Sequence, residues 1–204
     1  MDATTDRVVG RRVLLLQAGE RWAVRATLER LGLGITGAVT DPEAAVGAYR
    51  DTDPDVVVAD TGFGGGSGAA AVQAVKRLLA IRPRPVIFVS DDDPRDRGTA
   101  HDAARAGAFG FLHGPLTDDG LLAAIEVAAA RFAELQDCLR ERQALALTLE
   151  TRKLVERAKG IFMKRLGLDE SAAHRKLQVE SQNRRESMAV VAKRVIDGDE
   201  LLNA

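Results

Sequence analysis

Cysteine, histidine and aromatic residues are all scarce in this chain. The 204 residues include one cysteine, Cys138, so no disulfide bond can form within the chain and no cysteine cluster exists for zinc. The three histidines, His101, His113 and His174, are scattered without metal-ligand spacing. Because only 4% of the residues are aromatic, the core has to be built from aliphatic side chains. These shortages argue against a metal site and against catalysis by a thiol.

The sequence also lacks a membrane-spanning segment. No apolar run approaches the ~20 residues that a helix needs to cross a bilayer, and residues 1–12 lack the apolar region of a signal peptide. The hydrophobic content of 46% is ordinary for a soluble globular protein. We therefore expect a cytoplasmic protein that makes no contact with a membrane.

Charge is distributed unevenly along the chain. Residues 151–194 contain twelve Lys and Arg against five Asp and Glu, a surplus of seven positive charges. The whole chain has a formal net charge of −1, and Asp197, Asp199 and Glu200 add three negative charges, so residues 1–150 carry a net charge of −5. An acidic domain joined to a small basic one indicates a polyanion partner for the basic end.

Short apolar runs alternate with amphipathic segments through the first 130 residues. The alternation predicts an α/β domain with a five-stranded, doubly wound parallel sheet, whose ligand-binding edge lies at the carboxyl ends of the strands. The run at residues 55–60 is almost continuously apolar, which fits a strand buried on both faces. Strands are predicted at residues 12–16, 34–40, 55–60, 85–90 and 109–114.

This pattern resembles a response-regulator receiver domain, which has a flavodoxin-like fold, and we assign residues 11–120 to it. Asp60 follows an apolar strand at the place where receivers carry the phosphorylated aspartate. Ser90 ends the fourth strand, Phe111 is the aromatic residue of the fifth, and Pro115 follows. The resemblance implies that Asp60 is a possible phosphoacceptor and that Ser90 and Phe111 occupy switch positions.

Two parts of receiver chemistry are missing. Receivers hold Mg²⁺ with a pair of carboxylates after the first strand, where this chain has Gln17 and Ala18, with only Glu20 acidic. Receivers also place a Lys just before the proline, where this chain has Gly114. Without these groups the charge of a phosphoaspartate would be poorly compensated. We therefore predict a pseudo-receiver without aspartyl phosphorylation control, in which Asp60 is a strand-end or helix-capping carboxylate.

Nothing in the sequence favours an enzyme. The glycine-rich loop at residues 61–68 lacks the Gly-Lys-Ser/Thr ending of a P-loop and the last glycine of a nucleophile elbow. No strand end collects a nucleophile, a base and an orienting acid. We expect neither catalysis nor a cofactor.

Residues 121–150 carry an apolar stripe at helical spacing, with charged residues between its members. No Pro or Gly interrupts residues 121–159, so the stripe predicts a long helix that pairs as a parallel coiled coil and makes the protein a homodimer. Arg142 lies at a seam position and weakens this pattern. The alternative is a single amphipathic helix that packs on its own receiver. The stripe consists of Leu122, Ile125, Ala129, Phe132, Leu135, Leu139, Ala146 and Leu149.

Residues 151–197 predict a small bundle of three helices. The connector helix should continue to about Arg165 and end at Gly167. Asp169 is placed to cap a helix at residues 170–182, and Ser187 to cap a shorter one at residues 188–196.

The bundle resembles the ANTAR domain of transcription antitermination regulators. The run AKGIFM at residues 158–163, followed by the helix start at Asp169, is a specific signal. At Arg185 many family members carry Asn. The other residues that carry the resemblance are Arg152, Gly167, Glu170, Ala173, Leu177, Ser181, Gln182, Val191 and Ala192.

The resemblance implies an RNA-binding regulator that binds a pair of hairpins in nascent mRNA leaders and prevents terminator formation. A dimer would present two modules to two hairpins. Basic residues would hold phosphates while polar side chains approach unstacked loop bases. The expected contacts are Lys159, Lys164, Arg165, Arg184 and Arg185 to phosphates, with His174 and Gln182 near bases.

Two other functions stay open at this point. Residues 170–196 could form a helix-turn-helix of a DNA-binding response regulator. The pseudo-receiver dimer could instead be bound by a regulatory protein partner, with RNA binding incidental. Salt-dependent binding to a two-hairpin RNA in preference to duplex DNA would separate the first hypothesis from both.

Overall fold

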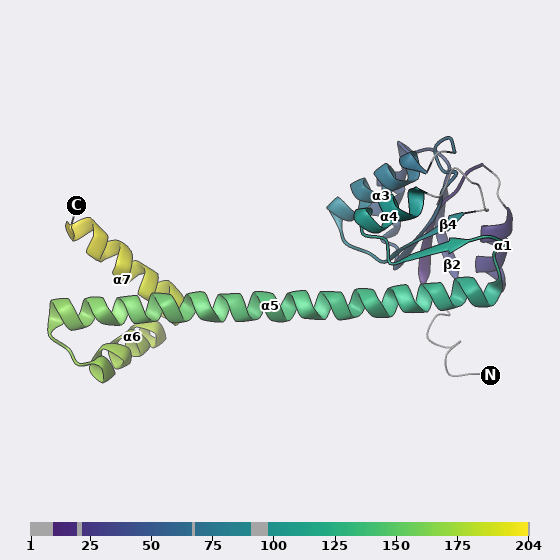
Figure 1. Cartoon of the computed structure of the whole chain (residues 1–204). Coiled ribbons are helices and arrows are strands. Elements are labelled where there is room, and N and C mark those ends of the chain that lie inside the picture. The colour runs from purple at the N-terminus through teal and green to yellow at the C-terminus, as the bar shows by residue number, and fades with distance from the viewer. Residues whose placement is uncertain (1–9, 20–21, 67, 91–97, 204) are drawn as a thin grey trace. The chain divides into compact units, whose positions relative to one another are not determined.

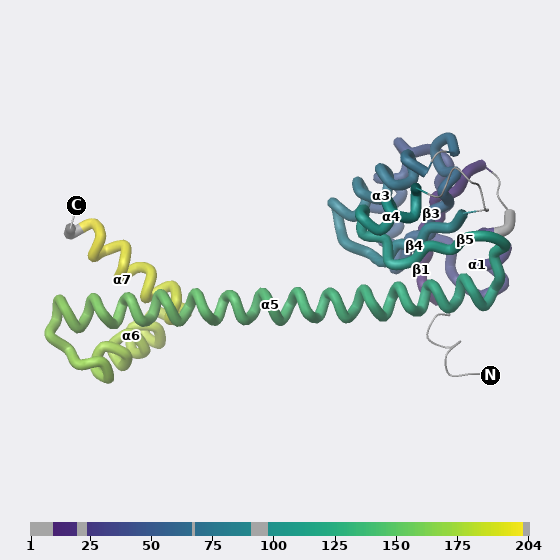
Figure 2. Tube along the Cα trace, viewed as in Figure 1, coloured from purple at the N-terminus to yellow at the C-terminus, as the bar shows by residue number. Residues whose placement is uncertain are grey.

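The computed structural model describes the chain except for residues 1–9, 20–21, 67, 91–97 and 204. The chain forms two compact units, Met1–Leu135 and Gln136–Ala204. The first is an α/β unit and the second is helical, as the cartoon in Figure 1 and the trace in Figure 2 show. None of the helices in the described residues is long and apolar enough to cross a membrane.

The α/β unit is built on a five-stranded, fully parallel sheet with the order β2-β1-β3-β4-β5. All five predicted strands form, each within one residue of its expected bounds, which confirms the predicted fold class. The strands are β1 (Arg12–Leu16), β2 (Gly34–Val39), β3 (Val56–Asp60), β4 (Val86–Ser90) and β5 (Gly110–His113). The helices between them are α1 (Trp22–Arg30), α2 (Ala44–Thr52), α3 (Ala69–Ile81) and α4 (Thr99–Ala106).

Two hydrophobic cores lie on opposite faces of this sheet. Successive side chains of a strand point to opposite faces, so Leu14 and Leu16 join one core while Val13 and Leu15 join the other. Helices α2, α3 and α4 pack on that face and, with the other strands and Phe63, complete the first core. The second is completed by α1 and by the beginning of α5 (Asp118–Leu166).

The first part of α5 therefore belongs to the receiver. Leu121 and Ile125 are fully buried against the sheet, and Phe132 meets Phe109 edge-on with 5.6 Å between ring centroids. Arg30 of α1 forms an ion pair with Asp118 at the start of the helix. The predicted connector at residues 121–150 is thus divided. Up to Phe132 the predicted stripe packs on its own receiver, as the alternative prediction had it, and beyond Phe132 its leucines are exposed in the single chain.

The helical unit contains the rest of α5 together with α6 (Glu170–Arg184) and α7 (Met188–Asn203). Gly167 follows α5 with a φ of +66°, and its N–H donates to the carbonyl of Met163, so α5 ends where the sequence predicts. Asp169 caps α6 by accepting a hydrogen bond of 2.7 Å from the N–H of Ala172. The three helices share a small core of Val155, Ala158, Leu177, Val191, Ala192 and Ile196.

Helix α7 is longer than expected. The sequence predicts an end at residue 196, but the helix continues to Asn203 through Asp197, Asp199 and Glu200. An acidic tail with few apolar residues gives little helical signal by itself. In the structure its carboxylates meet arginines of α5, and those ion pairs supply contacts that the local pattern does not contain.

Candidate nucleic-acid interface

The carboxyl edge of the sheet places the residues of the receiver resemblance next to one another. Gln17 follows β1, Asp60 ends β3 and Ser90 ends β4, and all three side chains are buried. The register pairs Leu16 with Ala59 and Ser90 with His113, so these strand ends lie along one edge. The Asp60 Oδ1 atom accepts a hydrogen bond of 2.7 Å from the N–H of Gly62. Asp60 thus holds the turn after its strand.

The described residues of this edge do not include the acidic pair with which receivers hold Mg²⁺. Gln17 brings a neutral amide to the place where receivers carry a carboxylate, and its Oε1 is buried without a hydrogen-bond partner in the described part of the chain. One oxygen of Asp60 already binds Gly62. Glu20 and Asp91, the neighbouring acidic residues, lie outside the described residues. Among those described, no three His, Cys, Asp or Glu side chains gather in a metal-binding group.

The predicted switch residue Phe111 is half-buried in β5. Its ring stacks on Phe88 of β4, with 6.3 Å between centroids and 9° between planes. Phe88 itself is fully buried. Phe111 therefore extends the hydrophobic core toward the surface, and the ring is anchored by an aromatic neighbour.

Lys159 lies where α5 crosses α6, and its ammonium is held by two carboxylates. The Nζ atom donates to Glu170 at 2.7 Å and to Glu156 at 2.9 Å, and the residue is only 6% exposed. The hydrogen bonds to Glu170 and then Glu156 raise the pKa of Lys159, and Lys159 in turn lowers the pKa of Glu170. A phosphate could reach this ammonium only in competition with both carboxylates.

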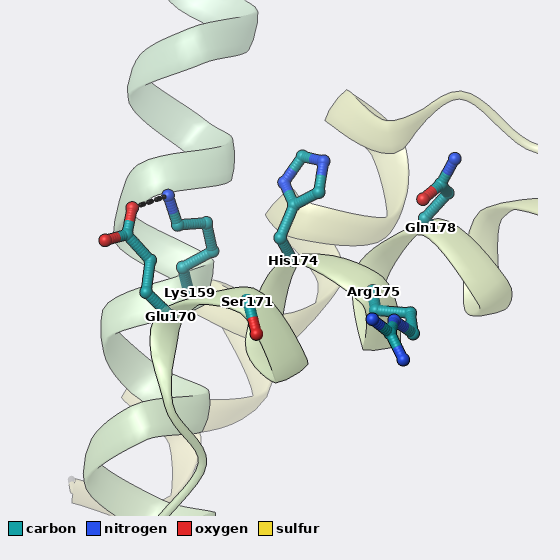
Figure 3. Close-up of a pocket in the computed structure, with 6 residues that line it drawn as sticks. All are labelled: Lys159, Glu170, Ser171, His174, Arg175 and Gln178. Atoms are coloured by element: carbon teal, nitrogen blue, oxygen red, sulfur yellow. Dashed lines mark hydrogen bonds and ion pairs between the residues drawn. The ribbon is translucent and has the colours of Figure 1, made fainter.

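An open groove of about 480 Å³ lies beside this ion pair, between α5 and α6. Figure 3 shows the Lys159–Glu170 contact at one end, with the His174 imidazole standing next to it and Gln178 one turn further along α6. Because residues three and four apart lie on one helix face, Ser171, His174 and Gln178 line the same side of α6. The groove thus offers hydrogen-bonding side chains and, from Arg175, a positive charge.

A second, smaller groove of about 220 Å³ lies between α6 and α7. Lys176 places its ammonium 5.8 Å from the centroid of the Phe162 ring, within the range of a cation–π contact. Arg184 pairs with Glu180 at 3.2 Å in the same groove. Sequence reasoning missed Lys176 and Arg194 as candidates, although the i, i+4, i+8 spacing of Lys176, Glu180 and Arg184 is visible in the sequence.

The remaining predicted contacts are dispersed over the helical unit. Lys164 and Gln182 are exposed, and Arg165 pairs with Asp199 of α7 at 2.8 Å. Arg185 follows α6 in the left-handed conformation, with a φ of 55°. Asn adopts that conformation more readily than Arg does, which gives a backbone reason for the Asn that the family resemblance associates with this position.

The predicted RNA-binding residues do not form one cluster. The structure brings Lys159 and His174 together in the groove between α5 and α6, while Arg184 lines the groove between α6 and α7. Arg165 is engaged by α7. The predicted contacts are thus spread over the helical unit and do not share one surface.

A parallel sheet in the order 2-1-3-4-5 is the flavodoxin-like topology that receiver domains have, and here a helical unit follows it. The family models agree, since residues 19–126 match the response regulator receiver domain and residues 143–196 match the ANTAR domain. The chain therefore belongs to the ANTAR-domain response regulators, a regulatory family. The ANTAR match begins eight residues before the predicted boundary at residue 151, within α5.

Relatives support this assignment over nearly the whole chain. The chain is 32% identical over 194 residues to the transcriptional regulatory protein PdtaR of Mycobacterium tuberculosis (strain CDC 1551 / Oshkosh), a match that covers 94% of this chain and 92% of PdtaR. Among solved structures, the signal receiver domain of a modulated diguanylate cyclase from Desulfovibrio desulfuricans G20 matches with a TM-score of 0.53 and 30% identity, over 61% of this chain and 97% of that one. The response regulator PhyR from Brucella abortus shares the fold, with a TM-score of 0.51 and 20% identity over 69% of this chain and 56% of that one.

Proposed function

We propose that this protein binds stem-loops in nascent mRNA leaders through its helical unit and regulates transcription by antitermination. The observation that carries the proposal is the ANTAR match at residues 143–196, which coincides with the basic part of the chain. ANTAR domains bind RNA, and single-stranded loops are the parts of RNA that side chains can read most directly. The similarity to a transcriptional regulatory protein supports the regulatory role.

The contacts we propose combine residues that line the two grooves with exposed residues outside them. His174 and Gln182 approach loop bases, and the exposed Lys164 and the guanidinium groups of Arg184 and Arg185 hold phosphates. Arg165 is a phosphate contact once it leaves Asp199. Lys159 has a different role, because it is buried between Glu156 and Glu170 and fixes α6 on α5.

The active form we propose is a homodimer that pairs through the part of α5 beyond its receiver. After Phe132 the helix bears apolar side chains that remain exposed in the single chain, among them Leu135, Leu139 and Leu149. A coiled coil of two copies would bury them, and it would place two RNA-binding units on one assembly. Two linked units bind a pair of stem-loops more tightly than either would alone.

Regulation by aspartyl phosphorylation is not part of the proposal. Gln17 replaces an acidic ligand, Gly114 stands where receivers carry a Lys, and Asp60 is buried and bonded to its own turn. A phosphoryl group on Asp60 would therefore lack counter-charges among the described residues. Sequestration by a partner protein, ligand binding and constitutive activity are the forms of control that need no phosphoryl site.

Selection from a pool of RNAs tests the function without knowledge of the transcript. The full chain is incubated with RNAs that carry two stem-loops with randomised loops, and bound species are recovered at physiological salt over several rounds. We expect a common loop sequence to be enriched in both stem-loops, and affinity to fall when either loop is scrambled. Recovery of unrelated sequences, or equal affinity for duplex DNA, would refute RNA recognition and favour the DNA-binding or protein-binding alternative.

A further inference from the structure

The acidic end of α7 lies against basic residues of α5. Glu200 accepts a hydrogen bond of 2.7 Å from Arg157, and Asp199 accepts one of 2.8 Å from the Nε of Arg165. The Asp199 side chain is 23% exposed, whereas those of Arg157 and Glu200 are about 60% exposed. Asp197, two residues before Asp199, is exposed and forms no ion pair within the described residues.

These pairs use the chemistry that would otherwise hold RNA. A guanidinium group binds carboxylate and phosphate oxygens in the same planar, forked geometry, so the two ligands compete for it. A phosphate at Arg157 or Arg165 therefore competes with an α7 carboxylate for the charge of the guanidinium group and for the N–H that the carboxylate binds. Lys164, the residue before Arg165, is also exposed. It forms no ion pair with the described residues of α7, so a phosphate can bind it without competing with those carboxylates.

We propose that Asp199 and Glu200 are specificity-determining residues for RNA. They keep Arg157 and Arg165 from binding arbitrary polyanions, so that an RNA forms these two phosphate contacts only when its other contacts hold it in place. This inference rests on the proposed RNA-binding function and adds a residue-level account of how a strongly basic surface avoids non-specific binding. Because the Arg157–Glu200 pair is exposed and the Arg165–Asp199 pair is partly exposed, each carboxylate lowers polyanion affinity by about 1.5- to 5-fold.

The test compares three substitutions that each remove one negative charge from the same helix end of the full chain. Asp199→Asn and Glu200→Gln remove a competing carboxylate, and Asp197→Asn is the matched control because its carboxylate pairs with no arginine in the described residues. The dissociation constant for polyuridylate is measured across a series of salt concentrations. We expect Asp199→Asn and Glu200→Gln to bind about 1.5- to 5-fold more tightly, with a salt slope steeper by about 0.7 because one more phosphate is neutralised. Asp197→Asn should leave the slope unchanged.

A second pair of variants distinguishes local competition from general charge. Arg165→Gln should have little effect on polyuridylate binding in the wild-type chain, since Asp199 already occupies that guanidinium. In the Asp199→Asn chain the same substitution should abolish the increase in affinity. Equal behaviour of the three acidic variants, or an equal effect of Arg165→Gln in both chains, would overturn the inference. Circular dichroism confirms that each variant is folded.

The inference and the proposed function can fail separately. If RNA selection recovers no preferred stem-loop, RNA recognition is refuted, while the polyuridylate comparison still decides whether Asp199 and Glu200 screen the arginines. If selection succeeds, the selected RNA is tested beside polyuridylate. We then expect the ratio of the two affinities to fall in Asp199→Asn, because the correct RNA already displaces the carboxylate with the help of its base contacts. An unchanged ratio would overturn the specificity role.

Discussion

Lys159 is 6% exposed between two carboxylates, although its place on a basic helix predicts a phosphate contact. The difference arises from Glu170, eleven residues later, whose position beside Lys159 depends on the turn at Gly167 and the start of α6. Lys159 joins the two helices that enclose the small core of the bundle. The buried ammonium stabilises the protein while it and its two carboxylate partners are charged. Removal of Lys159 would leave Glu156 and Glu170 without that positive charge.

Lys159→Met should lower the midpoint of thermal unfolding, with an effect that depends on pH. Pairing lowers the pKa of Glu170, so its contribution to stability is present above the ordinary value of 4.5 and is lost as the pH falls through the depressed pKa. The pKa of Lys159 is raised in the folded protein. Its contribution to stability is therefore complete below pH 10.5 and is lost as the pH rises through the pKa of the folded state. The difference in midpoint between the two chains should therefore be largest between about pH 5 and 10, on the order of several degrees, and shrink in acid.

The control for this measurement is Lys153→Met, which breaks the exposed pair of Lys153 with Glu150 on the same helix. Exposed pairs contribute little to stability, so this variant should unfold within about 1 °C of the wild type. Differential scanning calorimetry from about pH 3 to 9 gives both curves. An effect of Lys159→Met that is the same in acid and at neutral pH would contradict the ion-pair role.

Arg185→Gly should stabilise the protein. Arg185 is held at a φ of 55°, a conformation that costs a residue with a Cβ about 1–2 kcal/mol and costs glycine almost nothing. After the larger chain entropy of unfolded glycine is subtracted, the free energy of unfolding should rise by about 0.5 kcal/mol. Arg184→Gly, one residue earlier and still helical, should lower it by about 0.5–1 kcal/mol. Urea denaturation of the wild type and the two variants measures both changes in the free energy of unfolding. A lower free energy of unfolding for Arg185→Gly would contradict the strain that we assign to Arg185.

Helix α5 serves two units along its length. Its first turns carry Leu121, Ile125 and Phe132 into the receiver, and its last turns carry Val155 and Ala158 into the bundle core. Between these parts the leucines of the helix stay exposed in the single chain. A helix rarely keeps a long apolar stripe in water, and a second copy of the chain is the partner that the repeat predicts.

Leu139→Lys should shift the protein from dimer to monomer. Leu139 lies on the same stripe as Leu135 and is 38% exposed in the single chain, so a lysine there fits the monomer but would place a charge in the seam. We expect dimerisation to weaken by at least ~10-fold. Leu147→Lys, at a position 70% exposed and turned away from this stripe, is the control and should leave the dimer intact. Analytical ultracentrifugation reads the assembly state, and a wild-type chain that is monomeric at all concentrations would remove the proposed dimer.

The chain as a whole joins an acidic receiver to a basic output unit, with net charges of −5 for residues 1–150 and +7 for residues 151–194. The receiver keeps the sheet, the buried Asp60 and the buried Ser90 of its family. It has Gln17 where a metal-binding carboxylate is expected. Such a receiver can still pack, pair and bind proteins, because these properties depend on its surface and core and not on phosphoryl chemistry.

Acetyl phosphate with Mg²⁺ should leave the intact mass of the protein unchanged. The physical reason is the missing ligand set around Asp60, whose Oδ1 is already bonded to the N–H of Gly62. Mass spectrometry at near-neutral pH, where acyl phosphates survive longer than in strong acid or alkali, makes the measurement. A stoichiometric phosphoryl adduct that is lost in Asp60→Asn would refute the pseudo-receiver prediction, and an adduct that persists in that variant would point to another residue.

Much of the fold was predictable because its signals are local. Apolar runs such as residues 55–60 mark buried strands, Gly167 marks a helix end, and Asp169 marks the next start. The acidic extension of α7 was not predictable, since its carboxylates contact Arg157 and Arg165, more than thirty residues earlier. The sequence shows which residues are basic. It does not show which of them are paired with a carboxylate in the folded protein, because the partners of Lys159 and Arg165 lie on other helices.

The sequence by itself determined the parallel sheet, the loss of receiver carboxylates, the long helix and the ANTAR output unit, because apolar periodicity, missing residue types and short motifs are all written along the chain. Only the tertiary structure decided that the first turns of α5 belong to the receiver core, that Lys159 is a buried link and that Asp199 and Glu200 pair with two arginines. Each of these depends on side chains that meet across different helices, or across a helix and a sheet. Such contacts cannot be predicted from the separation of two residues in the sequence, because they depend on how the helices and the sheet pack in three dimensions.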